Sequence, residues 1–98
     1  MSYPLRVFYD CSTAHLCPAT RDFLEAESAR QVELIAATPY GWFLWAEENR
    51  RKQIPSDLAA VIRRARALGA EYVLFDCDAP LSSEFPIFEE FSARGEAP

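Results

Sequence analysis

The sequence contains no apolar run long enough to cross a bilayer, for which about 20 consecutive apolar residues are needed. Its first six residues, Met1-Ser2-Tyr3-Pro4-Leu5-Arg6, also lack the basic region followed by an apolar core that is typical of a secretion signal. Together these two absences predict a cytoplasmic protein that does not bind membranes.

Cysteine is scarce, and the three residues Cys11, Cys17 and Cys77 are an odd number, so we expect no disulfide framework. Cys11, His15 and Cys17 form the pattern C-x3-H-x-C, which offers soft metal donors but lacks the paired C-x2-C of structural zinc sites. Two interpretations stay open: a metal or thiol site, or core cysteines with His15 bonded to the local backbone. We expect the second, with no bound metal and no cofactor.

Positive charge is also scarce, since ten Lys and Arg stand against fifteen Asp and Glu, a net charge of −5. Nucleic-acid binders need clustered positive charge, so direct binding of DNA or RNA is not expected. The negative charge is local. Residues 1–69 carry nine basic and eight acidic side chains, whereas residues 70–98 carry one basic and seven acidic side chains.

Apolar residues are abundant at 50%, with 13% aromatic, and 98 residues suffice for one compact core but not for two. We therefore expect a single α+β domain over residues 1–98, in which residues 79–98 form an acidic and aromatic C-terminal extension. Six elements follow from the apolar pattern. Strands are predicted over residues 5–10, 32–37, 40–46 and 71–75, and helices over residues 19–30 and 56–68. Pro18 is expected in the first turn of the first helix. In the second helix, Ser56 is expected to cap the start, and Gly69 is expected just past the end.

The order strand, helix, strand, strand, helix, strand is typical of a split βαβ, or ferredoxin-like, two-layer sandwich. In that topology two helices cover one face of an antiparallel four-stranded sheet. The first and last strands then run antiparallel, which predicts that Cys11 and Cys77 lie at opposite edges of the sheet.

The third strand has apolar side chains on both faces, because Trp42 and Leu44 alternate with Phe43 and Trp45. The face that the helices leave open therefore needs a cover. We expect the C-terminal segment to fold across this face, with a partner protein or a second copy as the alternatives. The apolar residues that would cover it are Phe85, Ile87, Phe88 and Phe91.

Asp76 and Asp78 follow the last strand, and Glu47 and Glu48 are predicted near the same edge of the sheet. Such carboxylates can bind a divalent ion or act as an acid and base, but two aspartates after a strand more often form a turn. Because no basic partner or phosphate loop accompanies them, we predict no catalytic residues. The alternative is a small metal- or thiol-dependent enzyme that uses Asp76 and Asp78, or the cysteines and His15.

Four segments together resemble a known family. They are Ser12-Thr13-Ala14-His15-Leu16, Tyr40-Gly41-Trp42-Phe43, Ile54-Pro55-Ser56-Asp57-Leu58, and Tyr72-Val73-Leu74-Phe75-Asp76-x-Asp78 followed by Pro86-Ile87-Phe88. The sequence is similar to a family of small uncharacterised bacterial proteins, a domain of unknown function often carried on plasmids, integrated elements and phages. The resemblance implies a setting among mobile elements, where small acidic proteins often block host defences. It supplies no active-site residues, and Cys17 before Pro18 departs from the family pattern.

Charge and resemblance together lead to one leading hypothesis: a non-enzymatic inhibitor or adaptor of the anti-CRISPR or antirestriction type. It would act as a DNA mimic, placing an acidic surface in the basic nucleic-acid channel of a host protein or nucleoprotein complex. The expected partner-binding residues are all acidic: Asp76, Asp78, Glu84, Glu89, Glu90, Glu47 and Glu48. We expect a monomer or a weak homodimer, and an obligate homodimer joined through the aromatic sheet face is a third hypothesis.

Overall fold

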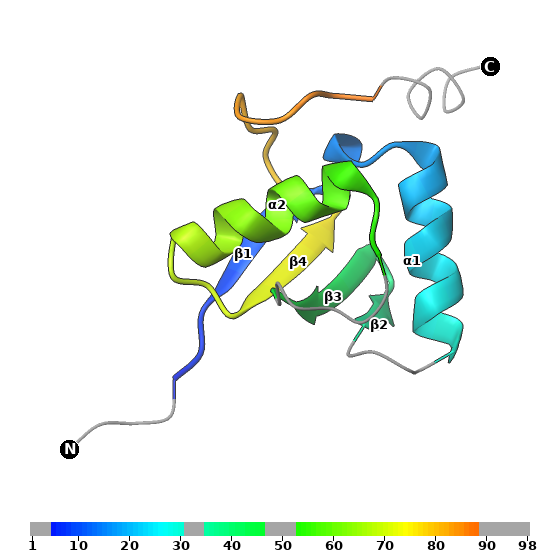
Figure 1. The fold of residues 1–98 in the computed structure, drawn as a ribbon, viewed down its shortest axis with the longest axis horizontal. Helices are drawn as coiled ribbons and strands as arrows, with labels where there is room; N and C mark the ends of the chain where they lie inside the picture. Colours follow the sequence, from blue (N-terminus) through cyan, green and yellow to red (C-terminus); the bar gives the residue numbers. More distant parts are fainter. Residues whose placement is uncertain (1–4, 31–34, 47–52, 89–98) are drawn as a thin grey trace.

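The computed structural model describes residues 5–30, 35–46 and 53–88, which form a mixed α+β fold (Figure 1). All six expected elements are present, and a short 3-10 helix follows the first strand. In chain order the elements are β1 (Phe8–Ser12), η1 (Thr13–His15), α1 (Pro18–Arg30), β2 (Ile35–Thr38), β3 (Gly41–Trp45), α2 (Ser56–Ala67) and β4 (Tyr72–Asp76). None of the helices in these ranges is long and apolar enough to span a membrane.

The sheet has the strand order β1-β4-β3-β2, with β4 parallel to β1 and antiparallel to β3. The prediction of a wholly antiparallel sheet is therefore wrong for the first strand. Ten residues separate Trp45 from Ser56, and about 3.3 Å per residue lets such a connection span the length of the sheet. Figure 1 shows that α2 then runs in roughly the same direction as β3, and β4 returns antiparallel to β3.

This pairing also corrects the predicted position of two cysteines. Cys11 lies opposite Phe75, and Ser12 lies opposite Asp76 in the parallel register of β1 and β4. Because the C-terminal ends of parallel strands lie at the same end of a sheet, Cys11 and Cys77 lie near one end of this sheet and not at opposite sides of it. They differ in environment, since Cys11 is buried and Cys77 is exposed.

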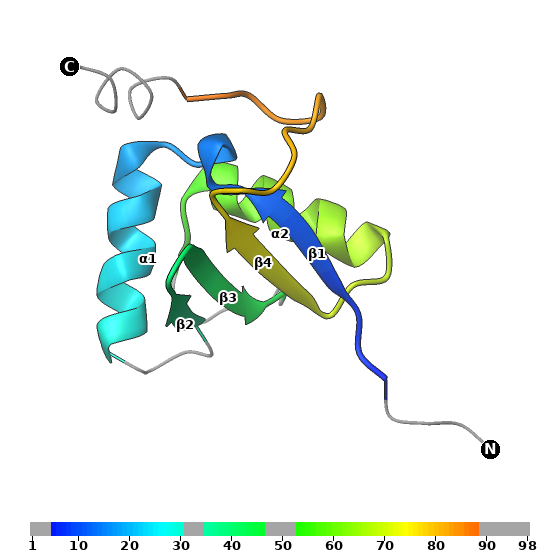
Figure 2. The same ribbon diagram turned by 180° about the vertical axis from the view of Figure 1, so that it is seen from behind.

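The two helices pack on the same face of the sheet and give the fold its two layers. α2 crosses β1 and β4, and α1 lies beside β2 and β3, whereas the view from behind shows a sheet face that no helix crosses (Figures 1 and 2). One buried cluster joins the layers: Leu24 from α1, Leu58, Val61 and Ile62 from α2, and Leu44, Val73 and Phe75 from the sheet.

The sequence correctly predicts the residue that follows the end of α2 but not the residue that caps its start. Gly69 has a φ of 90°, as expected for the residue just past a helix end, and Ala70 N–H donates to the Ala65 carbonyl at 2.9 Å. At the start, however, the cap is Pro55, which has no side-chain hydrogen bond, so the expected capping role of Ser56 is wrong.

Residues 79–88 do not cover the open sheet face, which corrects a second expectation. Instead they pack beside η1, because Phe88 N–H donates to the Ala14 carbonyl at 2.9 Å and the Phe85 ring lies 5.4 Å from the His15 ring. Ile87 is 46% exposed. Phe91 lies outside the described residues.

Candidate functional site on the open sheet face

A cluster of aromatic side chains lies on the sheet face without helices. Strand alternation and register place five apolar residues there, which we call the aromatic face: Phe8, Phe43, Trp45, Tyr72 and Leu74. The Phe43 ring stacks on Tyr72 at 5.1 Å and meets Phe8 edge-on at 6.1 Å. Phe8 and Trp45 remain 50% and 45% exposed, so this cluster is in contact with solvent.

Carboxylates follow the aromatic residues on the same face, at the ends of the parallel strands. Asp10 lies opposite Leu74, Asp76 lies one step further along β4, and Asp78 follows in the next turn. We call Asp10, Asp76 and Asp78 the acidic end. Within residues 5–30, 35–46 and 53–88, no Lys or Arg forms an ion pair with any of them.

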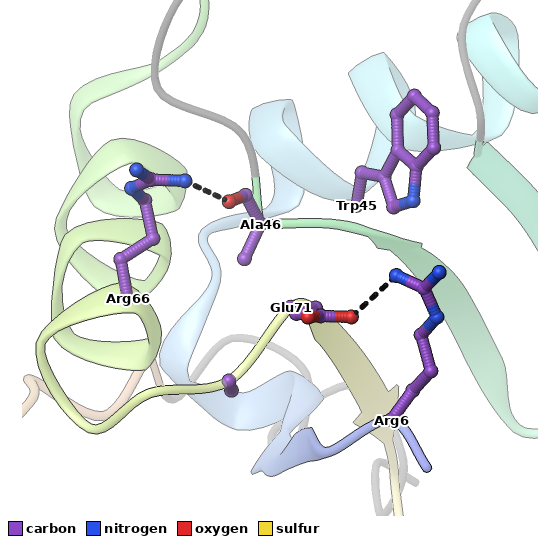
Figure 3. A pocket seen from close by; sticks show the side chains of 6 residues that line it. Arg6, Trp45, Ala46, Arg66 and Glu71 are labelled. Atoms are coloured by element: carbon purple, nitrogen blue, oxygen red, sulfur yellow. Dashed lines mark hydrogen bonds and ion pairs between the residues drawn. The ribbon is translucent and has the colours of Figure 1, made fainter. Parts of the chain in front are cut away.

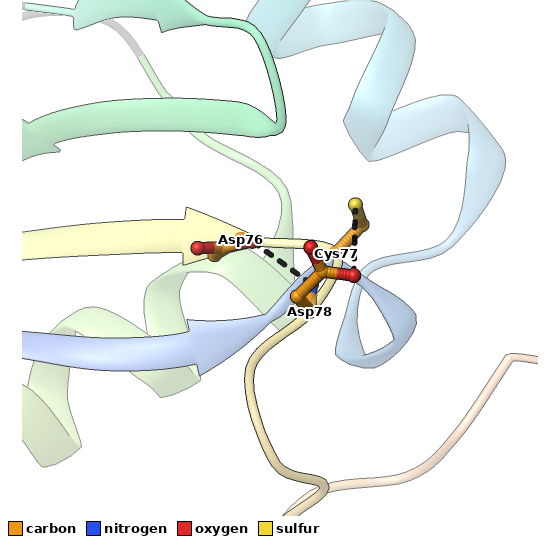
Figure 4. A group of neighbouring side chains, drawn as sticks. All are labelled: Asp76, Cys77 and Asp78. Carbon is orange, nitrogen blue, oxygen red and sulfur yellow. Dashed lines mark hydrogen bonds between the residues drawn. The ribbon is translucent and has the colours of Figure 1, made fainter.

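The turn after β4 confirms the interpretation of the two aspartates as turn residues. Asp76 Oδ1 accepts the Asp78 backbone N–H at 2.8 Å (Figure 4). In addition, Cys77 N–H donates to the Tyr40 carbonyl at 3.0 Å. These bonds fix Asp76 and Asp78 relative to the sheet. Asp10 was not among the predicted site residues, because only the parallel pairing of β1 with β4 brings it to this end.

Two other acidic side chains of the described part of the C-terminal third, Glu71 and Glu84, are paired with arginines instead of adding free charge to the acidic end. Arg64 on α2 binds Glu84 through two hydrogen bonds of 2.8 and 3.2 Å, and Arg6 binds Glu71 at 2.7 Å. Both of these acidic residues are thus neutralised by cations from the first part of the chain. The predicted partner-binding residues Glu47, Glu48, Glu89 and Glu90 lie outside the described residues.

The structure does not bring Cys11, His15 and Cys17 together as a site. Burial, with the nearby Asp10 charge, raises the pKa of the Cys11 thiol to about 12, so this thiol is protonated at neutral pH. The Cys17 thiol lies 3.4 Å from Thr20 Oγ1. Among the residues that the structure describes, the only close group of three potential metal ligands is Asp76, Cys77 and Asp78, whose donor atoms lie within 4.8 Å.

His15 is buried and bonds to the C-terminal segment rather than to the local backbone. Its Nδ1 lies 2.9 Å from the Pro86 carbonyl, and its Nε2 accepts the Ser82 backbone N–H at 2.9 Å. A neutral ring that is protonated on Nδ1 satisfies both bonds. Because both nitrogens are occupied, His15 holds residues 82–86 in place and is not placed to bind a metal or move a proton.

Cys77 adds little chemical reactivity to the acidic end. Partial desolvation, together with the carboxylates of Asp78 and Asp76, raises the pKa of its thiol, so it is a poor nucleophile at neutral pH. A protonated thiol between two hard carboxylates is a mixed donor set that suits neither soft nor hard cations well. This cluster therefore offers fixed negative charge more readily than catalysis.

Substituting His15→Phe is expected to loosen the C-terminal segment, because a phenyl ring keeps the contact with Phe85 but makes neither hydrogen bond. One lost buried hydrogen bond costs about 1 to 2 kcal/mol, which corresponds to roughly tenfold faster exchange of the Ser82 amide. Hydrogen exchange followed by mass spectrometry measures this change. Glu84→Gln is the control, because its exposed ion pair with Arg64 contributes little. Equal exchange rates in the two variants would contradict the role of His15.

The fold and site together define a small two-layer α+β domain with an open, aromatic sheet face that is acidic at one end. The chain matches the family model described as the family of unknown function (DUF5983) C-terminal domain over residues 8–90, most of its length, and it belongs to this family. It has no significant match among curated proteins or solved structures. The expected membership of a family of unknown function is thus confirmed.

Proposed function

We propose that this domain is a non-enzymatic protein-binding module, an inhibitor or adaptor, that docks its acidic end onto a basic nucleic-acid channel. The observation that supports this function is the acidic end itself. Asp10, Asp76 and Asp78 gather at one end of the sheet without a cationic partner among the described residues.

Charge complementarity gives the physical argument. Carboxylates that repel one another are stabilised when Lys or Arg side chains approach, and complementary potentials increase the rate of encounter. Arg binds carboxylates and phosphates with the same forked geometry, so the domain would compete with DNA or RNA for its partner. The mobile-element setting implied by the family resemblance favours a host defence complex, of the CRISPR or restriction kind, as that partner.

The environment of the candidate catalytic groups also favours binding over catalysis. The Cys11 thiol is buried, and both ring nitrogens of His15 hold backbone groups. One carboxylate oxygen of Asp76 accepts the Asp78 N–H in the turn after β4. Cys11, His15 and one carboxylate oxygen of Asp76 are therefore engaged in structure.

The triple variant Asp10→Asn/Asp76→Asn/Asp78→Asn is expected to lose partner binding by at least tenfold while remaining folded. Asn keeps the shape of Asp and can accept the turn hydrogen bond, so the substitutions remove charge without removing the turn. Tagged wild-type and variant domains are used to capture complexes from a nuclease-treated bacterial lysate, which mass spectrometry identifies. The wild type should capture one nucleic-acid-handling complex and release it when DNA or RNA is added.

A matched control separates local from overall charge. Asp22→Asn/Glu25→Gln/Glu84→Gln removes the same number of charges from positions outside the acidic end, and it should capture the complex as the wild type does. If both triple variants bind equally, or if added nucleic acid does not compete, the acidic end is not the binding surface.

A further inference from the structure

The aromatic face has the width of one α-helix. Its residues come from three neighbouring strands, β1, β4 and β3, in the rows Phe8–Tyr72–Trp45 and Leu74–Phe43. Three strands at about 4.8 Å spacing extend over roughly 10 Å, which matches the diameter of a helix with its side chains. Five-residue strands are about 17 Å long, a length that a helix covers in about 11 residues.

The charge along this face also has a direction. Asp10 and Asp76 lie where β1 and β4 end, whereas at the opposite end of the strands the charge of Arg6 is balanced by Glu71, so the negative charge lies at one end only. Figure 3 shows this ion pair and, beside it, Arg66 of α2, which donates to the Ala46 carbonyl at 2.9 Å. A helix carries partial positive charge at its N-terminus and partial negative charge at its C-terminus, so this arrangement favours one orientation of a docked helix.

A cavity beside Arg6 and Glu71 adjoins the aromatic face. It has a volume of about 300 Å³ and is lined by Arg6, Trp45, Ala46, Arg66, Ala70 and Glu71. Trp45, which lines this cavity (Figure 3), also belongs to the aromatic face, since it lies opposite Tyr72. The exposed indole thus lies where a large apolar side chain from the C-terminal turn of a docked helix would pack.

From these observations we infer that the open sheet face binds an amphipathic helix of the partner protein, whose apolar stripe covers the aromatic face. Its N-terminal turn carries Lys or Arg and lies over Asp10 and Asp76, and its C-terminal turn lies at the cavity beside Trp45. This inference rests on the proposed function and specifies the chemistry of the partner. It adds a third layer to the two-layer domain, as helices do on sheets covered on both faces.

A direct test uses two designed helical peptides of 14 residues with the same composition and the same leucine stripe. One peptide has its three lysines in the first turn, and the other has them in the last turn. Trp45 fluorescence reports binding in a Trp42→Phe background. That substitution should be mild, because the buried Trp42 Nε1 has no hydrogen-bond partner in the described chain. We expect a blue shift of Trp45 emission and at least tenfold tighter binding of the peptide with N-terminal lysines.

A pair of protein variants locates the binding surface. Phe8→Thr/Tyr72→Thr should weaken binding of that peptide at least tenfold, whereas Leu68→Thr/Leu81→Thr, which changes exposed apolar residues outside the face, should leave it unchanged. If the first double variant does not fold, the single change at the half-exposed Phe8 replaces it. Equal affinity for the two peptides, or full binding by the Phe8 variants, would overturn the inference.

Two further results separate this inference from the proposed function and from self-association. If the Phe8 variants still capture the complex that the acidic-end variant loses, the proposed function stands and the helix inference fails. If the peptide binds as expected but no nucleic-acid-handling complex is captured, the helix site stands and the proposed partner class fails. A wild-type dimer in sedimentation that Phe8→Thr converts to a monomer would show that a second copy occupies the face.

Discussion

Substituting Gly41→Ala is expected to destabilise the domain by more than about 3 kcal/mol, or to prevent folding, because β3 approaches β4 too closely for any side chain at this position. A Cβ atom on Gly41 would lie 1.8 Å from the Phe75 carbonyl oxygen and 2.7 Å from its carbon. Both are backbone atoms of β4, an inner strand of the sheet. They cannot move without breaking the pairing of Gly41 with Asp76, which also positions the acidic end.

Gly69→Ala is the matched control, since it also adds one methyl group to a glycine. Gly69 has a φ of 90°, but an added Cβ would meet no atom within 4 Å. Only the backbone cost of the left-handed conformation remains, about 1 to 2 kcal/mol. Urea unfolding followed by circular dichroism gives both free energies. A loss at Gly41 no larger than the loss at Gly69 would mean that the close contact between β3 and β4 is absent.

The elements were predictable from sequence because local patterns specify them. The periodic apolar residues of α2, the glycine past its end and the turn between β2 and β3 all act within a few residues. Strand order was not predictable in this way, because it depends on the path of a long connection. One signal in the sequence did indicate that β4 is an inner strand. Tyr72–Phe75 is a continuous apolar run, which is typical of a central strand, whereas β1 contains Asp10 and ends in Ser12.

The site was only partly predictable for the same reason. The turn at Asp76 and Asp78 is local, and its chemistry was correctly interpreted. Asp10 lies near them only because β1 and β4 pair in parallel. Glu84 adds no free charge to them because Arg64, 20 residues away in the sequence, binds it. A count of charges along the chain locates an acidic segment but does not show which charges remain without a cation in the fold.

Removing the carboxylate with Asp57→Ala is expected to lower the free energy of unfolding by about 2 to 3 kcal/mol at neutral pH. This one side chain holds the starts of both helices. Its Oδ2 accepts the Cys17 N–H at 2.9 Å, just before α1, and its Oδ1 accepts the buried Thr20 hydroxyl at 2.6 Å. Asp57 Oδ1 also accepts the N–H of Leu58, the next residue in α2, at 2.9 Å. Without Asp57, the Thr20 hydroxyl and these two N–H groups lose their acceptor at the junction of the helices.

The contribution of Asp57 should also depend on pH, with a sign fixed by its pKa. Burial opposes ionisation of this carboxyl, but hydrogen bonds from Thr20, Cys17 and Leu58 outweigh burial and lower the pKa below the usual 3.8. A carboxyl with a lowered pKa in the folded state stabilises that state above its unfolded pKa and loses this contribution as the pH falls through the folded value. The difference between wild type and Asp57→Ala should therefore be constant from about pH 5 to pH 7 and shrink below about pH 4.

Urea titrations of the wild type and of Asp57→Ala across this pH range measure that difference. Asp22→Ala is the control, because Asp22 is exposed on α1 and should change stability by less than about 0.5 kcal/mol at any of these pH values. A difference for Asp57 that stays the same below pH 4 would mean that its charge is irrelevant and that only its shape holds the helices. A shrinking difference would show that the ionised carboxylate links α1 to α2, and thereby fixes the layer that leaves the opposite sheet face open.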